Sequence, residues 1–195
     1  MTAPTTSTRP TARFFWGTAA AVIAADLVSK LLAQAHLAHY VPRHILGNVL
    51  RFTLAYNPGA AFSMSLGQHS RYIFGAFAVV ALIVLWKLYR MTGAGARAGD
   101  RVRVVALGLA FGGAAGNLID RFRSPRGVVD FIDIGVGDVR FWTFNLADSA
   151  VTVGALVLAW SLSSEERESA AAKVAVERDA ARSVDAPSGV PGPRE

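Results

Sequence analysis

Cysteine is absent from this chain of 195 residues. Its absence excludes disulfide bonds, a thiolate nucleophile and every metal site that depends on cysteine. Charged residues are also scarce, at 17% of the chain, where an average soluble domain has about 25%. Hydrophobic residues make up 52%, and the mean hydropathy is +0.35. Because the apolar residues gather in long runs, the composition predicts an integral membrane protein.

Two further residue types that often carry catalysis are missing from most of the chain. The first glutamate is Glu165, and the four histidines all lie within residues 36–69. His36 and His39 are spaced to share one face of a helix, but no obvious third ligand accompanies them. We therefore expect neither a metal ion nor any other cofactor, and aspartate remains as the main acidic group.

Four apolar runs have close to the roughly 20 residues that a helix needs to cross a bilayer. They cover residues 14–32, 71–89, 102–120 and 146–162. The sequence thus predicts an all-α membrane protein with four transmembrane helices in a domain over residues 14–162. The flanking residues 1–13 are predicted to form a disordered tail, and residues 163–195 a tail that is partly helical or disordered.

The distribution of positive charge predicts the orientation of these helices. The connection between the second and third runs carries Lys87, Arg90, Arg97, Arg101 and Arg103 against a single acidic residue. The positive-inside rule places this connection and both chain termini in the cytoplasm, although the opposite loops also contain arginines. The basic residues flank apolar runs, so the net charge of +6 indicates contact with anionic lipid and not with nucleic acid.

Two extracytoplasmic segments have the pattern of strands. In Val49–Asn57, apolar residues alternate with polar ones, which is typical of a half-buried strand. The segment Val128–Phe144 contains two short strand patterns around a glycine-rich turn. Together they predict a small β-sheet that rests on the outer face of the membrane.

Several polar residues within the apolar runs have ordinary structural explanations. Asn145 and Asp148 are spaced like a helix N-cap and its acidic partner in the first turn. Asp26 and Lys30 are four residues apart, which suits an ion pair whose lysine extends outward to the head groups. Each explanation accounts for one pair taken alone.

Depth favours a different interpretation of the same residues. Asn117, Asp120 and Arg121 close the third run, where Arg121 could simply reach the head groups. With both termini inside, these residues and the two pairs above all fall in the outer half of the bundle. An ionisable residue within a membrane costs free energy and usually has a function. Because three helices place such residues at the same depth, we expect these residues to form one shared polar site.

The third run also has a face made of small residues. Gly108, Gly112 and Gly116 recur every four residues and so line one side of the helix. Such a surface lets a neighbouring helix approach closely. We therefore expect Asn117 and Asp120 to face another helix and not the lipid.

The aspartates predict a chemistry for this site. Two carboxyl groups brought close in a poorly hydrated pocket share one proton. One then activates a water molecule as general base, while the protonated one donates to the scissile carbonyl, as in aspartic peptidases. Asp148 is one candidate, but the spacing alone does not choose among Asp120, Asp130 and Asp133 as its partner.

Five motifs follow one another in an order that is typical of one family. They are DLVSK (26–30), NPGAAFS (57–63), GGAAGNLIDR (112–121), VVDF (128–131) and FNLADS (144–149). In this order the motifs resemble those of bacterial lipoprotein signal peptidase, also called signal peptidase II. The resemblance extends over residues 14–162 and excludes both tails.

This resemblance implies a fold and an activity. Signal peptidase II is a four-helix aspartic peptidase of the bacterial cytoplasmic (inner) membrane, with a small extracytoplasmic β-sheet and sensitivity to globomycin. It cleaves prolipoproteins on the N-terminal side of a diacylglyceryl-modified cysteine. The partners implied are these lipidated substrates and membrane lipid, and we expect a monomer.

The resemblance also implies roles for individual residues. The VVDF and FNLAD motifs place the catalytic pair at Asp130 and Asp148. Supporting or substrate-contacting residues are implied at Asp26, Lys30, Asn57, Gly59, Asn117, Asp120, Arg121 and Asn145.

Two other functions remain as alternatives. A small proton-coupled transporter could use the Asp and Lys residues as a relay, but its carboxylates should lie near the bilayer midplane, with access from both sides. A non-catalytic assembly subunit could use the same residues to hold its helices together. Substitution of either catalytic aspartate would distinguish a peptidase from both.

Overall fold

The computed structural model of the protein describes residues 12–59, 67–92 and 98–184. The chain divides into two compact units, Met1–Leu158 and Ala159–Glu195. The predicted disordered tail over residues 1–13 lies outside the described residues except for Ala12 and Arg13, which begin the first helix. The end of the predicted C-terminal tail, residues 185–195, also lies outside them.

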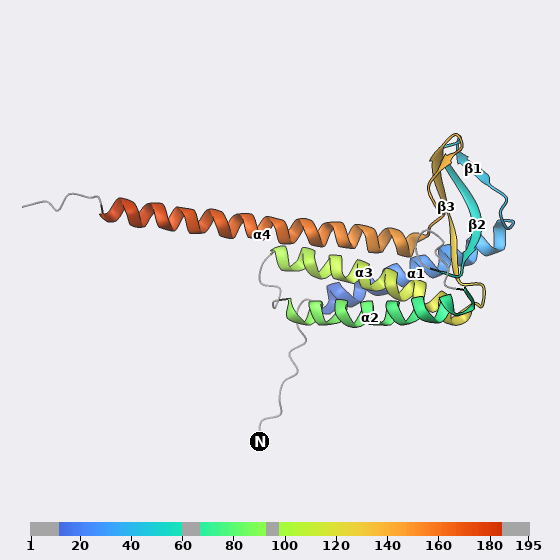
Figure 1. The fold of residues 1–195 in the computed structure, drawn as a ribbon, viewed down its shortest axis with the longest axis horizontal. Coiled ribbons are helices and arrows are strands. Elements are labelled where there is room, and N and C mark those ends of the chain that lie inside the picture. Colours follow the sequence, from blue (N-terminus) through green and yellow to red (C-terminus); the bar gives the residue numbers. More distant parts are fainter. Residues whose placement is uncertain (1–11, 60–66, 93–97, 185–195) are drawn as a thin grey trace, which may run out of the picture. The chain divides into compact units, whose positions relative to one another are not determined.

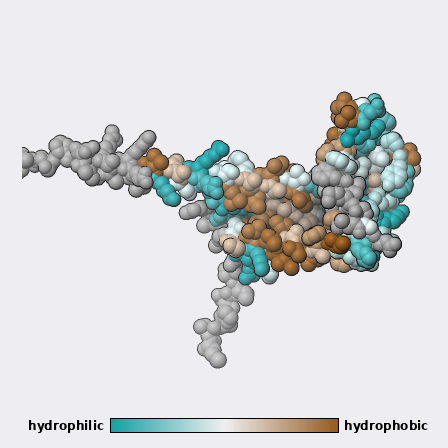
Figure 2. Space-filling model, viewed as in Figure 1, coloured by the Kyte–Doolittle hydropathy of each residue, from teal (hydrophilic) through white to brown (hydrophobic). Residues whose placement is uncertain are grey.

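Four long helices are the main elements of the described chain. They are α1 (Ala12–His36), α2 (Ser70–Met91), α3 (Ala98–Arg123) and α4 (Leu146–Val184). Each is long and apolar enough to cross a membrane, and hydrophobic side chains gather over them in Figure 2. In the first unit, α1, α2 and α3 lie side by side (Figure 1), and the start of α4 packs on α3.

A four-stranded antiparallel sheet lies at one end of the helices of the first unit (Figure 1). Its strands, in the order β1-β2-β3-β4, are β1 (Arg43–Leu46), β2 (Leu50–Asn57), β3 (Val128–Val136) and β4 (Val139–Arg140). The short 3-10 helix η2 (Gly67–His69) precedes α2. The sheet and the four helices confirm the predicted fold class.

The predicted strands differ from the observed ones in detail. The strand expected at Val49–Asn57 is β2, one residue shorter. The strand β1 was not predicted, because its sequence RHIL has no clear alternation. β4 has only two residues, and beyond it Phe144 pairs with Ile132 through an isolated bridge.

Apolar side chains attach the sheet to the helices. Ala33 of α1 forms a buried cluster with Leu54 of β2 and with Val129 and Phe131 of β3. The alternation in β2 therefore directs Leu54 inward, where it is 4% exposed. The result is a sheet fixed to the last turns of α1, close to where α3 ends and α4 begins.

The glycine face predicted on α3 packs against α1. A Cβ atom would lie 2.9 Å from the Phe15 carbonyl oxygen if added to Gly108, and 2.5 Å from Asp26 Oδ2 if added to Gly116. Added to Gly113, it would lie 2.3 Å from the carbonyl oxygen of Ala147 in α4. Because no side chain fits at these distances, glycine allows α1 and α4 to approach α3 closely.

Candidate active site

The polar residues singled out in the sequence converge where the helices meet the sheet. Asp26 and Lys30 come from α1, Asn57 and Gly59 from β2 and the residues after it, Asn117, Asp120 and Arg121 from α3, Asp130 from β3, and Asn145 and Asp148 from the start of α4. Hydrogen bonds and ion pairs join these residues into a continuous network.

The start of α4 positions Asp148. The backbone N–H of Asp148 donates to Asn145 Oδ1 at 3.0 Å, and the backbone N–H of Asn145 donates to Asp148 Oδ2 at 3.2 Å. This reciprocal pair is a capping box, in which the side chains satisfy amides that the first helical turn leaves free. The capping interpretation of the sequence is therefore correct, and it fixes the Asp148 carboxylate at the helix N-terminus.

Lys30 lies at the centre of a buried ionic cluster. Its side chain is fully buried, and Nζ lies 2.7 Å from Asp26 Oδ2 and 2.9 Å from Asp120 Oδ2. The third ammonium hydrogen is donated to Asn117 Oδ1 at 2.9 Å. The interpretation in which Lys30 extends outward to the head groups is wrong, because three acceptors inside the bundle bind all its donors.

The two carboxylates of this cluster also bind neighbouring elements. Asp26 Oδ1 accepts the backbone N–H of Ala147, in the first turn of α4, at 3.0 Å. Asp120 Oδ2 accepts the backbone N–H of Val129, on β3, at 3.2 Å. The cluster thus joins α1 and α3 to the elements that carry Asp130 and Asp148.

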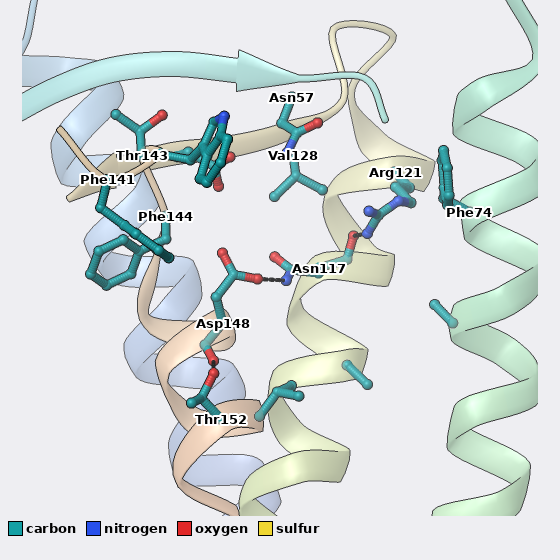
Figure 3. A pocket seen from close by; sticks show the side chains of 15 residues that line it. Asn57, Phe74, Asn117, Arg121, Val128, Phe141, Thr143, Phe144, Asp148 and Thr152 are labelled. Carbon is teal, nitrogen blue, oxygen red and sulfur yellow. Dashed lines mark hydrogen bonds between the residues drawn. The ribbon is translucent and has the colours of Figure 1, made fainter. Parts of the chain in front are cut away.

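Asp130 and Asp148 are linked through two asparagine side chains. Asn145, which is fully buried, donates Nδ2 to Asp130 Oδ1 at 2.7 Å. Asn117 donates Nδ2 to Asp148 Oδ1 at 2.7 Å, the bond drawn in Figure 3. The two amides are themselves bonded, from Asn145 Nδ2 to Asn117 Oδ1 at 3.1 Å. The carboxyl groups are therefore members of one network supported by neutral donors.

The surroundings of Asp130 change its acidity. Burial raises the pKa of its carboxyl group to about 7, and the negative charge of Asp148 adds to this effect. Hydrogen bonds from Asn145 and Asn57 and the charge of Lys30 oppose the rise without cancelling it. Asp130 can therefore hold a proton close to neutral pH, as a general acid requires.

Asp133 has a different environment, although it lies on the same strand. It is three residues from Asp130, so the two side chains lie on opposite faces of β3, as the odd spacing predicts. Asp133 Oδ2 accepts hydrogen bonds from Arg51 Nε at 3.1 Å and Thr53 Oγ1 at 3.0 Å, and Asp133 Oδ1 lies 2.7 Å from the Arg140 guanidinium. Burial alone would raise the pKa of Asp133, but these basic and hydroxyl partners lower it below its usual value.

A cavity of about 420 Å³ opens beside the two linked carboxyl groups. Figure 3 shows Asp148, Asn117 and Arg121 around it, with Phe141 and Phe144 on the side of Asp148 and Phe74 next to Arg121. Its lining consists of Asn57, Phe74, Ala78, Ala114, Asn117, Arg121, Val128, Asp130, Phe141, Trp142, Thr143, Phe144, Asp148, Val151 and Thr152. The wall is therefore mostly apolar, with the carboxyl, amide and guanidinium groups gathered among these side chains.

The aromatic part of this wall was not predicted. Phe141, Trp142 and Phe144 follow β4 directly and precede the Asn145 cap, while Phe74 comes from α2. A signal was present in the aromatic run FWTF immediately before the motif that carries Asp148. By its pattern alone, this run predicts only part of a strand.

Arg121 binds the protein backbone. Its guanidinium donates to the carbonyl oxygens of Asn117 at 3.1 Å and Gly59 at 3.0 Å. The backbone N–H of Gly59 donates to Asn57 Oδ1 at 3.0 Å. Arg121 therefore connects α3 with the end of β2, and the interpretation in which it only reaches head groups is wrong. The rest of the NPGAAFS motif, residues 60–63, lies outside the described residues.

Within the described parts of the chain, no group of three His, Asp or Glu side chains has the arrangement of a metal site. His36 instead contacts the Leu32 carbonyl oxygen through Nδ1, at 3.0 Å. His39 packs against the rings of Tyr40 and Tyr56. The two histidines therefore occupy local structural contacts.

Comparison with known sequences finds close relatives. A model of the family described as signal peptidase (SPase) II matches residues 18–164. A lipoprotein signal peptidase of Paraburkholderia phytofirmans is 39% identical over 160 residues, which cover 80% of this chain and 89% of the relative. A lipoprotein signal peptidase of Pseudomonas aeruginosa is 38% identical over 156 residues, which cover 77% of this chain and 88% of the relative. A lipoprotein signal peptidase of Streptomyces coelicolor is 41% identical over 138 residues, which cover 68% of this chain and 62% of the relative.

Solved structures give the same result for the fold. A bacterial membrane enzyme solved at 2.3 Å resolution superimposes with a TM-score of 0.67 and 27% identity, covering 78% of this chain and 88% of the other. A second bacterial membrane enzyme, solved at 1.9 Å resolution, superimposes with a TM-score of 0.65 and 29% identity, covering 76% of this chain and 91% of the other. The resemblance of the five motifs is therefore confirmed along most of the chain, and the protein belongs to the signal peptidase II family.

Proposed function

We propose that this protein is an aspartic endopeptidase that removes signal peptides from prolipoproteins, on the N-terminal side of a diacylglyceryl-modified cysteine. The observation that carries the proposal is the joint placement of Asp130 and Asp148. Both carboxyl groups line one cavity, and Asn145 binds both residues. Family membership supports a signal peptidase, and the lipoprotein signal peptidases among its relatives point to lipidated precursors.

The proposed reaction uses one proton shared between the two carboxyl groups. The ionised carboxylate takes a proton from a water molecule, whose oxygen attacks the scissile carbonyl carbon. The protonated carboxyl group gives its proton to the carbonyl oxygen, which forms a neutral tetrahedral diol. When the carbon–nitrogen bond breaks, the first group returns its proton to the leaving amine, and a diol hydroxyl reprotonates the second. The pair ends with the single proton that it had at the start.

The position of the cavity suits a substrate held in a bilayer. It lies at the end of the apolar helices that adjoins the sheet. A lipidated cysteine keeps its acyl chains in the hydrocarbon, so the bond just before it is presented near the head groups. The apolar wall that includes Phe74 and Trp142 can accept apolar residues of the signal peptide, and Asn57 and Arg121 can contact its backbone.

The proposal includes a location and an inhibitor. The chain crosses the bacterial cytoplasmic membrane with both termini inside, so that the sheet and the cavity face the extracytoplasmic side. Residues 14–162 form the peptidase domain between the two tails. It acts as a monomer on prolipoproteins within membrane lipid, and globomycin inhibits it.

Asn substitutions at the two aspartates test the dyad. Asp130→Asn and Asp148→Asn should each lower the rate of precursor processing on the order of 10³-fold or more, since each removes an acid–base group. The matched control is Asp138→Asn, which makes the same change at an exposed turn between β3 and β4. Cleavage of a lipidated precursor by purified protein in detergent is the measurement, and it should persist in a chelator. Normal cleavage by either dyad variant would contradict the proposal and reopen the transporter and assembly alternatives.

A further inference from the structure

The side-chain amide of Asn117 lies between an ammonium group and a catalytic carboxylate. Its Oδ1 accepts a hydrogen bond from Lys30 Nζ at 2.9 Å, and its Nδ2 donates to Asp148 Oδ1 at 2.7 Å. An ammonium group has only donors, so the oxygen of the amide must face Lys30. Rotation of the amide by half a turn would place its NH2 group against the ammonium and its oxygen against the carboxylate. Lys30, together with Asn145 Nδ2, which donates to the same oxygen at 3.1 Å, therefore determines which end of Asn117 faces Asp148.

Lys30 can act as this reference because it is itself held in place. Its side chain is fully buried, and its two other donors bind Asp26 and Asp120. Backbone N–H groups of Ala147 and Val129 hold these two carboxylates in turn. The ammonium group thus has no alternative acceptor to turn toward, and the orientation of Asn117 follows from a rigid frame.

The fixed amide makes the two catalytic carboxyl groups unequal. Asp148 receives one N–H donor on each oxygen, from Asn117 Nδ2 and from the Asn145 backbone, and it lies in the first turn of α4. Donors and a helix N-terminus both favour a negative charge. Asp130 lies on a strand and is 3% exposed, and its donors are Asn57 and Asn145 Nδ2, the second of which it shares with Asn117 Oδ1 and the Val129 carbonyl oxygen.

We propose that Lys30 is a positioning residue that sets the location of the catalytic proton. By fixing the amide of Asn117, it keeps Asp148 as the ionised carboxylate that takes the proton of the attacking water. Asp130 then carries the proton that is given to the scissile carbonyl oxygen. The inference rests on the proposed function and adds to it an assignment of the two chemical roles.

Asn117→Asp is the main test, because it keeps the acceptor for Lys30 and replaces the donor to Asp148 with a negatively charged carboxylate oxygen. At pH 7 the variant should lose about 100-fold in kcat, as does removal of one preorganised donor from an active site, with KM changed less than threefold. As the pH falls, the introduced carboxyl group takes up a proton and can again donate to Asp148. The ratio of variant to wild-type kcat should therefore rise toward acidic pH.

The pH profile distinguishes this role from a purely structural one. The charged groups that surround the amide are Lys30 and Asp26 on α1, Asp120 and Arg121 on α3, Asp130 on β3 and Asp148 on α4. All of them are retained in the variant and in the wild type, so a change of the ratio with pH arises from the new carboxyl group and from its effect on these neighbours. Asn48→Asp is the matched control, at an exposed position between β1 and β2, and its ratio should stay near one. A ratio for Asn117→Asp that does not change with pH would overturn the proposal.

A double-mutant cycle tests whether Lys30 acts through Asn117. Lys30→Met should lower kcat in the wild-type background but cause little further loss in an Asn117→Leu background, because the amide that it orients is gone. Additive losses would show that Lys30 acts independently and would overturn the proposal. If Lys30→Met does not yield folded protein, the Asn117→Asp profile decides alone.

Failure of this inference is distinguishable from failure of the proposed function. If Asp148→Asn abolishes processing while the Asn117→Asp ratio stays constant with pH, only the role of Lys30 is wrong. If Asp148→Asn still cleaves normally, the dyad itself is wrong, and the positioning role is refuted with it.

Discussion

Two pairs of carboxyl groups lie in adjacent parts of one network, yet their surroundings differ. Asp26 and Asp120 share the ammonium group of Lys30, at 2.7 and 2.9 Å. Asp130 and Asp148 instead receive hydrogen bonds from the neutral amides of Asn145 and Asn117. Within residues 12–59, 67–92 and 98–184, neither of this second pair forms an ion pair with lysine or arginine.

Under the proposed function, this difference distinguishes two aspartates that stabilise the fold from two that take part in the reaction. Asp26 and Asp120 each bind the Lys30 ammonium group and a backbone N–H group, so both carboxylates are held in fixed contacts within the bundle. Asp130 is buried and Asp148 is half-buried, and neither contacts a cation in the described part of the chain, so the two carboxyl groups can share a proton, which is the state that acid–base catalysis needs. Asn117 touches both pairs, since it accepts from Lys30 and donates to Asp148. The rigid pair can therefore orient the reactive one.

Removal of the shared cation should have the largest effect on stability. Lys30→Met leaves Asp26 and Asp120 buried without a counter-charge, and loss of one partner from a buried pair costs about 3–5 kcal/mol. We expect a loss of about 5 kcal/mol, the upper end of that range, because two carboxylates lose the same partner. Unfolding of the purified protein in mixed detergent micelles measures it. The control Lys87→Met, at an exposed position of α2, should change stability by about 0.5 kcal/mol or less. A loss below about 1 kcal/mol for Lys30→Met would contradict the structural role given to this pair.

The stability contributed by Asp130 should respond to pH in the opposite sense from that contributed by Asp133, whose pKa is lowered. Because the pKa of Asp130 is raised to about 7, the folded protein keeps a proton that the unfolded chain releases near pH 4. The stability that this proton contributes is complete below about pH 4 and is lost as the pH rises toward 7. At about 1.4 kcal/mol per pH unit, the loss is on the order of 4 kcal/mol.

Asp130→Asn removes this titration, so its stability should fall less than that of the wild type between pH 4 and 8. Unfolding midpoints measured across this range test the expectation. In the wild type, kcat/KM should decline above about pH 7, because Asp130 then loses the shared proton. Parallel stability profiles for the variant and the wild type would show that Asp130 titrates normally.

Much of this arrangement could be predicted from local sequence patterns. The four helices follow from apolar runs of membrane-spanning length, and β2 follows from its alternation. The glycine face of α3 and the capping box of Asn145 and Asp148 depend on residues close together in the sequence, so their spacing was sufficient.

The pairing of the aspartates could not be predicted in this way. Asp120 binds Lys30, and Asp133 binds Arg51 and Arg140, so both are occupied by partners that folding brings to them. All three contacts join different elements of the fold, and the spacing of the residues in the sequence does not predict them. The choice of Asp130 rested on family resemblance, and the geometry now gives it a physical reason: Asp130 is the one of the three that lines the cavity with Asp148.

Asp133 offers the test with the smallest expected effect. It lies on the same strand as Asp130, but its carboxylate is paired with the arginines Arg51 and Arg140. Its pKa is lowered by Arg140, Thr53 and Arg51 despite burial, so its stabilising effect is present above about pH 4 and is lost as the pH falls below that value. Asp133→Asn should cost about 1 kcal/mol at pH 7, because its arginine partners are partly exposed, at 20% and 16%. Processing activity should stay within about threefold of the wild type, a change of less than about 1 kcal/mol in the barrier. Unfolding midpoints at pH 7 and pH 3.5 provide the measurement, and the difference from the wild type should shrink at the lower pH. A loss of activity as large as that expected for Asp130→Asn would instead place Asp133 in the reactive group and remove the distinction between the two faces of β3.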